Sequence, residues 1–348
     1  MTTPTTEAQE RRGTVAVIGA GQCGRMTAQR VAESDVFETV LLVDVIDGLA
    51  EGIALDINQS RAIVGFETTV VGRTIRIGDH DHELIADAEI VVIAAGAVPE
   101  PHWSVKQLIR ANEPIVRSSG GLIAHGAPSA VVIVMTNPVD VMTAIAHEAT
   151  GFPPRRVMGQ SVLLDTSRFA DFVAEQLSVL RSSVNAIVVG SHAHDRSMMP
   201  LLSSATVDAV PLTSMLDGAQ LNTAVSATRR GGSDVARMLN THSSFYAPSA
   251  AAARMVRAVK DDNETALPVC AYLEGAYGIR DAWLGVPARL GRNGVQEIVE
   301  LALPEEEYMA LAAAAKILRA EQREILAPLL TASEQDAPER ERRGQSNS

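Results

Sequence analysis

A glycine-rich segment near the start of the chain has the residue types and spacing of a loop that binds phosphate groups. An apolar run, Val15 to Ile18, leads directly into Gly19, Gly21 and Gly24. The first glycine permits a tight turn, the second lets the backbone approach a pyrophosphate, and the third lets the following helix pack on the strand. Asp44 ends the next apolar run, about 20 residues later, where its carboxylate can accept hydrogen bonds from ribose hydroxyls and repel a 2′-phosphate. The pattern predicts a site for NAD rather than NADP, against the alternative of a glycine-rich turn and a helix-capping aspartate.

Gln22 and Cys23 fill the remaining positions of this loop and belong to the same expected cofactor site. A helix is expected from Arg25 on, and the amides at its start would face the phosphates. Cys23 is interpreted as a small residue at the helix start, because no resolving cysteine is near it. Cys270 is the second of the two cysteines, and no CxxC pair exists, which excludes a disulfide framework and fits a reducing compartment.

The elements that position this loop form a repeating pattern in the first half of the chain. Four apolar runs, bounded by Gly or Pro and separated by helical stretches, indicate strands buried on both faces. They are Thr14–Ile18, Thr39–Val43, Glu89–Ala94 and Ala130–Met135. Such alternation is typical of a doubly wound parallel α/β sheet, a Rossmann domain, whose ligands bind at the carboxyl ends of the strands.

The pattern changes after Gly151–Pro154, where a mixed α+β domain is expected. We expect a helix near Ser167–Leu180, strands at Val184–Gly190, Leu267–Tyr272 and Ala282–Pro287, a hairpin turn at Asn293-Gly294, and a helix from Pro304 to about Leu326. The predicted domains are residues 13–155 for the NAD-binding unit and 156–331 for the substrate unit. Residues 1–12 and 332–348 are polar and aperiodic, and are expected to be flexible tails.

From about residue 13 to residue 326 the chain resembles the malate/lactate dehydrogenase family, in particular its bacterial malate-type branch. The motifs that carry this resemblance occur in the family's order. They are Leu42-Val43-Asp44, Ala94-Ala95-Gly96-Ala97, Thr136-Asn137-Pro138, Leu164-Asp165-Thr166-Ser167-Arg168-Phe169, Tyr246-Ala247-Pro248 and Leu290-Gly291-Arg292-Asn293-Gly294-Val295. The resemblance implies an NAD-dependent oxidoreductase that interconverts a 2-hydroxy acid and a 2-oxo acid. It also implies a cytoplasmic homodimer or homotetramer.

The resemblance assigns roles to residues at the matching positions. A histidine acts as acid and base, oriented by Asp165, while Arg168 holds the substrate carboxylate through a two-pronged hydrogen bond. Their i,i+3 spacing places Asp165 and Arg168 on one helix face, although a plain surface ion pair has the same spacing. Asn137 is expected to contact the cofactor ribose or a substrate oxygen, or else to serve as a turn residue before a proline. Ala95 and Gly96 would contact the cofactor.

The catalytic histidine segment departs from the family pattern. The family has Gly-His-Gly-Asp after the corresponding strand, whereas this chain reads Ser191-His192-Ala193-His194-Asp195. Counting forward from the strand selects His192, and counting backward from the following Pro-Leu selects His194. We favour His192, because the end of the strand fixes the side chain relative to Asp165. A third reading is that neither histidine is catalytic.

The loop that follows Ala97 departs further. The family carries two arginines there, one for the far end of the substrate and one for the reacting carbonyl, and this chain has Pro99 and Val105 at those positions. Loss of a group that offsets developing charge typically costs about 3 kcal/mol or more. Lys106 or His102 could substitute, although a lysine at a helix start is commonly a solvated charge.

Composition excludes several other classes of function. A net charge of −12 would repel nucleic acid and anionic membranes, and no run approaches the roughly 18 apolar residues of a membrane span. The run Asp79-His80-Asp81-His82-Glu83 is interpreted as a solvated loop, so no metal site is expected. A small 2-oxo or 2-hydroxy acid is the expected partner.

Three hypotheses on function remain open from the sequence. The first is an NAD-dependent dehydrogenase for a 2-oxo acid other than oxaloacetate or pyruvate. The second is a paralogue that binds NAD without turnover, and the third is a malate dehydrogenase with a rebuilt substrate loop. Activity with a panel of 2-oxo acids separates them.

Overall fold

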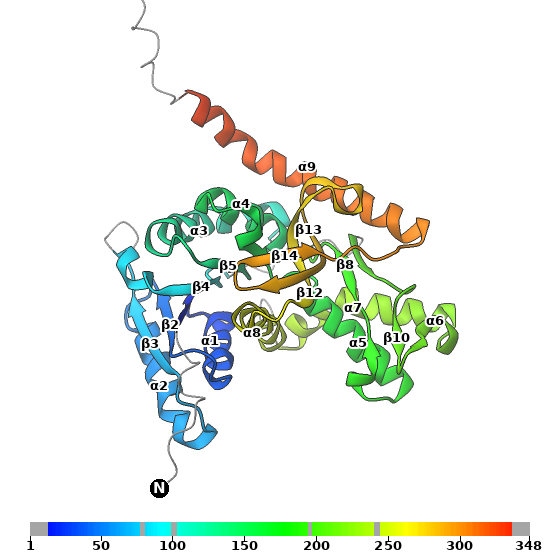
Figure 1. Cartoon of the computed structure of the whole chain (residues 1–348), viewed down its shortest axis with the longest axis horizontal. Coiled ribbons are helices and arrows are strands. Elements are labelled where there is room, and N and C mark those ends of the chain that lie inside the picture. Colours follow the sequence, from blue (N-terminus) through cyan, green and yellow to red (C-terminus); the bar gives the residue numbers. More distant parts are fainter. Residues whose placement is uncertain (1–12, 77–80, 99–102, 194–196, 240–243, 336–348) are drawn as a thin grey trace, which may run out of the picture.

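One mixed sheet runs through the whole molecule. The computed structural model describes residues 13–76, 81–98, 103–193, 197–239 and 244–335, with side chains through residue 326. In these segments eleven strands form the large sheet, in the order β3-β2-β1-β4-β5-β6-β12-β13-β8-β9, with β14 paired to β13. The expected tails largely lie outside the described residues, as do 77–80, 99–102, 194–196 and 240–243 (Figure 1).

The first six strands of this order are parallel and form the expected Rossmann sheet. They are β1 (Thr14–Ile18), β2 (Thr39–Asp44), β3 (Thr69–Thr74), β4 (Ala88–Ile93), β5 (Val131–Val134) and β6 (Val157–Gly159). The four strands expected from apolar runs are all present. β3 was not expected, because it lies at the edge of the sheet and its sequence, TVVGRT, is not a continuous apolar run. β6 also belongs to this sheet although it follows residue 155, so the parallel layer ends at Gly159.

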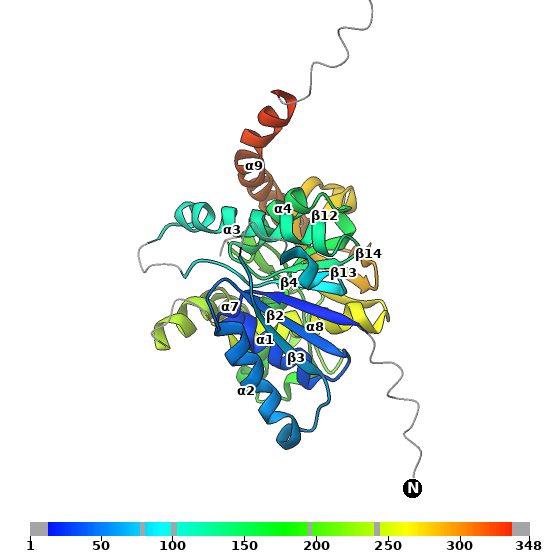
Figure 2. The same cartoon turned by 90° about the vertical axis from the view of Figure 1, so that its left-hand side faces the viewer.

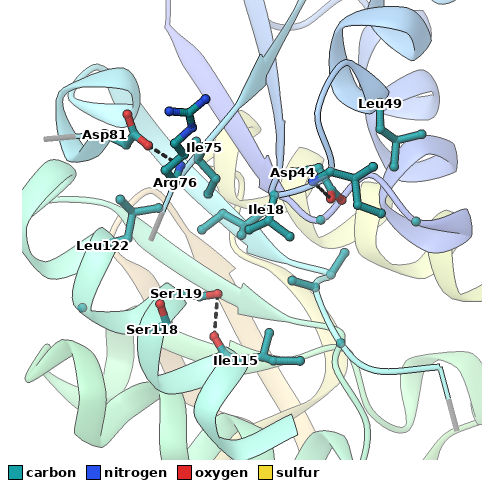
Figure 3. A pocket seen from close by; sticks show the side chains of 18 of the residues that line it. Ile18, Asp44, Leu49, Ile75, Arg76, Asp81, Ile115, Ser118, Ser119 and Leu122 are labelled. Carbon is teal, nitrogen blue, oxygen red and sulfur yellow. Dashed lines mark hydrogen bonds between the residues drawn. The ribbon is translucent and has the colours of Figure 1, made fainter. Parts of the chain in front are cut away.

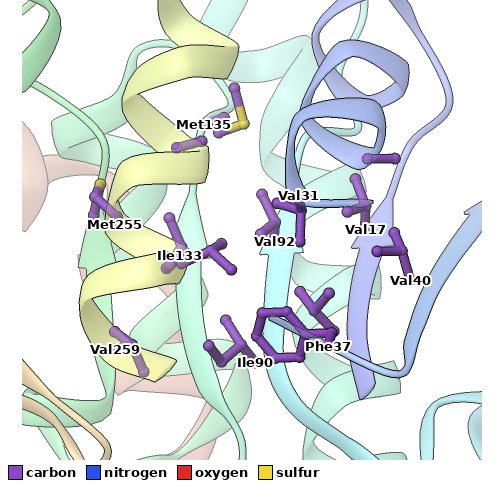
Figure 4. Packing of buried hydrophobic residues seen from close by; sticks show 14 of the residues in the cluster. Val17, Val31, Phe37, Val40, Ile90, Val92, Ile133, Met135, Met255 and Val259 are labelled. Atoms are coloured by element: carbon purple, nitrogen blue, oxygen red, sulfur yellow. The ribbon is translucent and has the colours of Figure 1, made fainter. Parts of the chain in front are cut away.

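Helices cover both faces of the parallel sheet (Figure 2). One face carries α1 (Gln22–Glu33), α2 (Leu49–Val64) and α8 (Tyr246–Asp261), and the other carries α3 (Val105–Gly126) and α4 (Val139–Thr150). Figure 4 shows how Val31 of α1 packs toward Val17 and Val92, while Met255 and Val259 of α8 lie against Ile133. Continuous apolar strands are stable only when both faces are covered in this way. Helix α8 therefore ties the second half of the chain to the first.

The second half continues the sheet with antiparallel strands. They are β8 (Val188–Gly190), β9 (Met198–Pro200), β12 (Thr265–Glu274), β13 (Arg280–Gly291) and β14 (Gly294–Ile298), and a small separate sheet contains β7 (Val184–Asn185), β10 (Thr206–Val207) and β11 (Val210–Pro211). The hairpin expected at Asn293-Gly294 joins β13 to β14. The single strand expected at 184–190 was wrong. Its two ends pair with different partners, β7 with β10 and β8 with β13 and β9.

The remaining helices complete the substrate unit. They are α5 (Leu163–Leu177), α6 (Leu212–Met215), α7 (Gly218–Met238) and α9 (Glu305–Gln335). Helix α9 crosses the top of the molecule in Figure 1 and ends nine residues later than the expected Leu326, so that Pro328 lies inside it. Among the described residues, no helix combines the length and the apolar character needed to cross a membrane.

Candidate active site

The glycine loop joins β1 to α1, and each of its three glycines meets a different steric situation. Gly19 has a φ of 100°, and a Cβ there would lie 2.5 Å from the backbone nitrogen of Ala95. A Cβ on Gly24 would overlap the carbonyl oxygen of Gly19. No atom lies within 4 Å of the position that a Cβ would take on Gly21. The backbone at Gly21 is therefore open to an approaching phosphate, as the loop requires.

A cavity of about 520 Å³ opens beside this loop, at the carboxyl ends of β1, β2 and β4 (Figure 3). Its apolar wall comes from side chains of several elements, namely Ile18, Ile46, Leu49, Ile75, Ile115 and Leu122. Asp44 and the backbone of Gly19 and Gly21 supply polar groups at the loop end. Further polar side chains line the cavity farther from the loop, namely Arg76, Asp81, His82, Ser118, Ser119 and His125. An apolar slot with a few fixed polar groups suits a flat base linked to a ribose and phosphates.

Asp44 is held at the wall of this cavity by two backbone N–H groups. Its Oδ2 accepts a hydrogen bond from Ala20 at 2.6 Å, and its Oδ1 accepts one from Ile46 at 2.9 Å. Each carboxylate oxygen has a further lone pair for a ribose hydroxyl. The residues present therefore fit an NAD molecule.

The other expected cofactor residues lie around the same opening. Gln22 is the exposed first residue of α1, and Ala95 and Gly96 follow β4 and line the cavity. Cys23 is half-buried beside α8, and burial raises its pKa to about 11. It is therefore a neutral thiol near pH 7, which agrees with its interpretation as a small residue at the helix start without a redox role.

A second group of polar side chains forms where α5 meets the end of β8. Asp165 is fully buried, and its two carboxylate oxygens bind two different partners. Its Oδ2 accepts a hydrogen bond from Nδ1 of His192 at 2.7 Å, and its Oδ1 accepts one from NH1 of Arg168 at 3.1 Å. Arg168 is itself only 13% exposed. The alternative of a plain surface ion pair is therefore wrong, because the carboxylate lies in the interior between a histidine and an arginine.

The charge state of His192 follows from its surroundings. Burial lowers the pKa of this imidazole, but the adjacent carboxylate of Asp165 raises it, and the net pKa lies above the ordinary value for histidine. Since Nδ1 is bound to the carboxylate, Nε2 is the nitrogen left to exchange a proton with a ligand. Such a pair can hold a proton at Nε2 and release it.

Two glycines on α7 leave room for the side chain of Arg168. A Cβ on Gly231 would lie 3.0 Å from Cδ of Arg168, and one on Gly232 would lie 3.4 Å from both terminal nitrogens. NH2 of Arg168 also donates a hydrogen bond to Oγ of Ser244 at 3.4 Å. Only a helix surface without side chains lets the guanidinium lie this close to α7.

Comparison with known proteins covers both halves of the chain. The family model for the NAD binding domain of lactate/malate dehydrogenase matches residues 13–159, and that for its alpha/beta C-terminal domain matches residues 163–328. The chain belongs to the lactate/malate dehydrogenase family. It is 40% identical to malate dehydrogenase from Methanosarcina barkeri over 88% of this chain and 96% of that protein. It is 41% identical to malate dehydrogenase from Thermomicrobium roseum, with the same two coverages.

Solved structures of this family superpose closely. Malate dehydrogenase from Salinibacter ruber gives a TM-score of 0.83 at 37% identity, covering 90% of this chain and 99% of that one. Lactate dehydrogenase from Cryptosporidium parvum, complexed with lactic acid and nicotinamide adenine dinucleotide, gives 0.83 at 33% identity, covering 90% and 98%. This dehydrogenase therefore uses NAD and interconverts a 2-hydroxy acid and a 2-oxo acid.

The position of Asp44 predicts how the dehydrogenase discriminates between cofactors. NADH should bind about a hundredfold more tightly than NADPH, because a 2′-phosphate would lie against the fixed carboxylate. Asp44→Ser should reduce this ratio at least tenfold, as measured by calorimetry. Asp47→Ser, which removes an exposed carboxylate outside the cavity wall, is the matched control. Equal affinities in the unaltered enzyme would contradict the role of Asp44.

Several expected site residues lie away from the Asp165 cluster or outside the described residues. His194, Pro99 and His102 belong to the segments that the structure does not describe. Lys106 was considered either as a substrate contact or as a solvated charge at the helix start. Its ammonium pairs with Glu324 of α9 at 3.2 Å, and both side chains are at least 70% exposed. The structure therefore places Lys106 as a solvated charge and not beside the Asp165 cluster, because the start of α3 directs it to the surface near α9.

Val105 is placed by a local capping motif, whereas Asn137 is held by a hydrogen bond from a distant residue. Ser104 and Gln107 form a capping box, which makes Val105 the first residue of α3. Asn137 is exposed just beyond the end of β5, and its carbonyl accepts a hydrogen bond at 2.6 Å from Nδ2 of Asn112. Oδ1 of Asn112 accepts another from the N–H of Ala97 at 2.7 Å.

Sequence reasoning missed Asn112 and Asp140. Asn112 is 2% exposed, and its side chain hydrogen-bonds to both loops that flank the cofactor opening, at Ala97 and at Asn137. Asp140 is fully buried at the start of α4. A signal for it was present, since it is the one acid within the apolar stretch from Val139 to Ala146. A buried acid in such a stretch needs hydrogen-bond donors from elsewhere in the fold.

Proposed function

We propose that this dehydrogenase reduces a 2-oxo acid whose tail is not a carboxylate, with His192 as its acid and base and Arg168 as its carboxylate ligand. The observation that carries the proposal is the buried Asp165, which binds both His192 and Arg168. One carboxylate thereby sets a proton-transfer group and a cationic group side by side. This pair suits a substrate with a carboxylate next to a hydroxyl or carbonyl carbon.

The role of His192 follows from its two ring nitrogens. Nδ1 is bound to Asp165, so the ring direction is fixed and Nε2 faces away from the carboxylate. When bound at the glycine loop, NADH would provide the hydride. In reduction of the oxo acid, Nε2 of His192 gives its proton to the carbonyl oxygen. In the reverse direction the neutral Nε2 takes the proton from the hydroxyl. Asp165 stabilises the charged imidazole in both directions.

Arg168 supplies the substrate's counter-charge. Its guanidinium is a planar fork that can bind two carboxylate oxygens together. NH1 is bound to Asp165 and the side chain lies against Gly231 and Gly232, so the fork is held before the substrate arrives. A fixed fork loses less entropy on binding than a free side chain does.

The tail preference rests on the loop that precedes α3. Between Val98 and Lys106 the chain contains Glu100 but no arginine, and Val105 opens the helix. Lys106 pairs with Glu324 on the surface. A second substrate carboxylate would therefore find no arginine in this loop to pair with, and Glu100 adds a negative charge to the loop's sequence. Burial of this second carboxylate without a partner would cost free energy on the order of several kcal/mol.

A second candidate substrate is oxaloacetate. The support for it is that the curated relatives are named malate dehydrogenase. In that case some cation of this chain must replace the family arginine. A panel of 2-oxo acids with NADH separates the two candidates. We expect oxaloacetate to give kcat/KM below about 10⁴ M⁻¹s⁻¹ and an acid with a neutral tail to give more. The reverse ranking would make the chain a malate dehydrogenase with a rebuilt loop.

We further propose a cytoplasmic homodimer or homotetramer. Exposed apolar side chains on α2 and α7, among them Leu55, Ile63 and Met238, support an interface between copies of the chain. Cys23 and Cys270 are both free thiols, which supports a reducing compartment.

A further inference from the structure

Asp140 is a buried carboxylate that contacts the segment carrying His192. It lies on the first turn of α4 and is 0% exposed. Its Oδ2 accepts hydrogen bonds from Oγ of Ser191 at 2.8 Å and from the backbone N–H of His192 at 3.0 Å. Its Oδ1 accepts one from Oγ of Ser161 at 2.6 Å. All three donors are neutral groups.

The donors belong to segments that carry the catalytic groups. Ser161 lies two residues before α5, the helix of Asp165 and Arg168, and Ser191 directly precedes His192. Asp140 therefore joins α4 to both segments. In the part of the chain that the structure describes, no lysine or arginine forms an ion pair with it. A buried charge without a counter-ion is costly unless its surroundings satisfy it, so three hydrogen bonds indicate a specific use.

A glutamine from α9 supports the backbone of the same residue. Nε2 of Gln322 donates to the carbonyl of Asp140 at 3.2 Å and to the carbonyl of Trp283 at 2.9 Å. Its Oε1 accepts from the N–H of Trp283 at 3.1 Å. Gln322 is 4% exposed, so these bonds are shielded from water. The start of α4 is thus fixed from both sides.

We propose that Asp140 is a positioning residue for His192, one that holds its backbone in place and supplies a second negative charge behind its imidazole. This rests on the proposed role of His192 as acid and base. Asp165 orients the ring from its Nδ1 side, while Asp140 holds the chain from which the ring projects. Together the two carboxylates fix the direction and the charge of one side chain.

The charged and titratable groups that face His192 come from three elements. Asp165 and Arg168 belong to α5, Asp140 to α4, and Cys270 of β12 lies beside Asp140. Burial and the charge of Asp140 raise the pKa of Cys270 well above its ordinary value, so it remains a neutral thiol. Both carboxylates favour the charged imidazole, whereas burial and Arg168 oppose it.

Asp140→Asn removes the negative charge of this side chain but keeps its size and shape. The amide oxygen can still accept from Ser191 and His192, and the amide nitrogen can donate to Ser161, so the loop keeps its hydrogen bonds. We expect the pKa of His192, read from its imidazole carbon by NMR titration, to fall by about one unit. At a pH above that value, kcat for reduction should fall about tenfold, because less imidazolium is present.

Asp140→Ala removes the acceptor as well as the charge. We expect kcat to fall a further tenfold or more beyond the asparagine variant, with the Kd for NADH within about threefold of the unaltered enzyme. Thr143→Val is the matched control, because it removes a buried hydroxyl of the same helix that bonds only within α4 and beside Cys270. It should lower Tm without moving the pKa of His192.

Unchanged His192 pKa and kcat in Asp140→Asn would overturn the proposal, even if Asp140→Ala failed to fold. The NMR titration needs no turnover, so it tests the link between Asp140 and His192 independently of the reaction. A shifted pKa together with full activity of His192→Gln would preserve the electrostatic link but overturn the proposed base. A shifted pKa with the expected loss of kcat supports both.

Discussion

His192→Gln should lower kcat by about a thousandfold while leaving the Kd for NADH nearly unchanged. Glutamine retains an N–H donor for Asp165, but it cannot give or take a proton at the position of Nε2. Proton transfer by a positioned side chain is typically worth about 10²–10⁴ in rate. Steady-state kinetics and calorimetry on one preparation measure both quantities.

The control for this prediction is His194→Gln, which changes the same residue type two positions away. We expect a clearly smaller loss, because His192 is the histidine bound to Asp165 at 2.7 Å. Equal and mild losses in the two variants would contradict an acid/base role for either. A larger loss from His194→Gln would move that role to His194.

The pH dependence has a defined sign. Burial lowers the pKa of His192, but Asp165 and Asp140 raise it, and the net shift is upward. Reduction of the oxo acid needs the imidazolium, so its kcat should stay high below this raised pKa and fall as pH rises through it. Oxidation of the hydroxy acid needs the neutral imidazole, so its kcat should rise as pH rises through the same pKa.

Arg168→Lys should lower kcat/KM for the 2-oxo acid by about a thousandfold. Lysine keeps the positive charge but offers a single ammonium in place of the planar fork that lies against Gly231 and Gly232. We expect the Kd for NADH to stay within about threefold, because Arg168 lies outside the cofactor cavity.

Arg230→Lys is the matched control for this substitution. Arg230 is on α7 next to the same glycines, but its side chain is 61% exposed and faces Asp234. Its replacement should leave kcat/KM unchanged. If Arg168→Lys lost less than about tenfold, the guanidinium would not be the carboxylate ligand.

Local sequence patterns predicted the first half of the fold well. The strands around Val17, Val92 and Ile133 are apolar along most of their length, which is sufficient to indicate a parallel sheet covered on both faces. Gly19, Gly24 and Asp44 lie at fixed separations along the chain, so their common site could be predicted without knowledge of distant contacts.

The rest of the site depends on contacts between distant segments. Asp140 is 52 residues from His192, and Asn112 is 25 residues from Asn137. Nothing in the local pattern says which donor a buried Asp140 will meet. The choice between His192 and His194 as the partner of Asp165 likewise depended on whether the strand before them or the loop after them sets the position of the histidine. The strand end brings His192 to Asp165, while His194 lies outside the described residues.

The contact of Gln322 with Asp140 joins residues 182 positions apart. During synthesis of the chain, the parallel strands β1 to β5 and the helices between them can pair as soon as they have been made, since these partners are close in sequence. The backbone carbonyl of Asp140 can bond to Gln322 only after almost the whole polypeptide has been synthesised. The parallel strands can therefore pair early, whereas α8, which covers one face of their sheet, and the support behind the histidine segment are added only after the second half of the chain has been made.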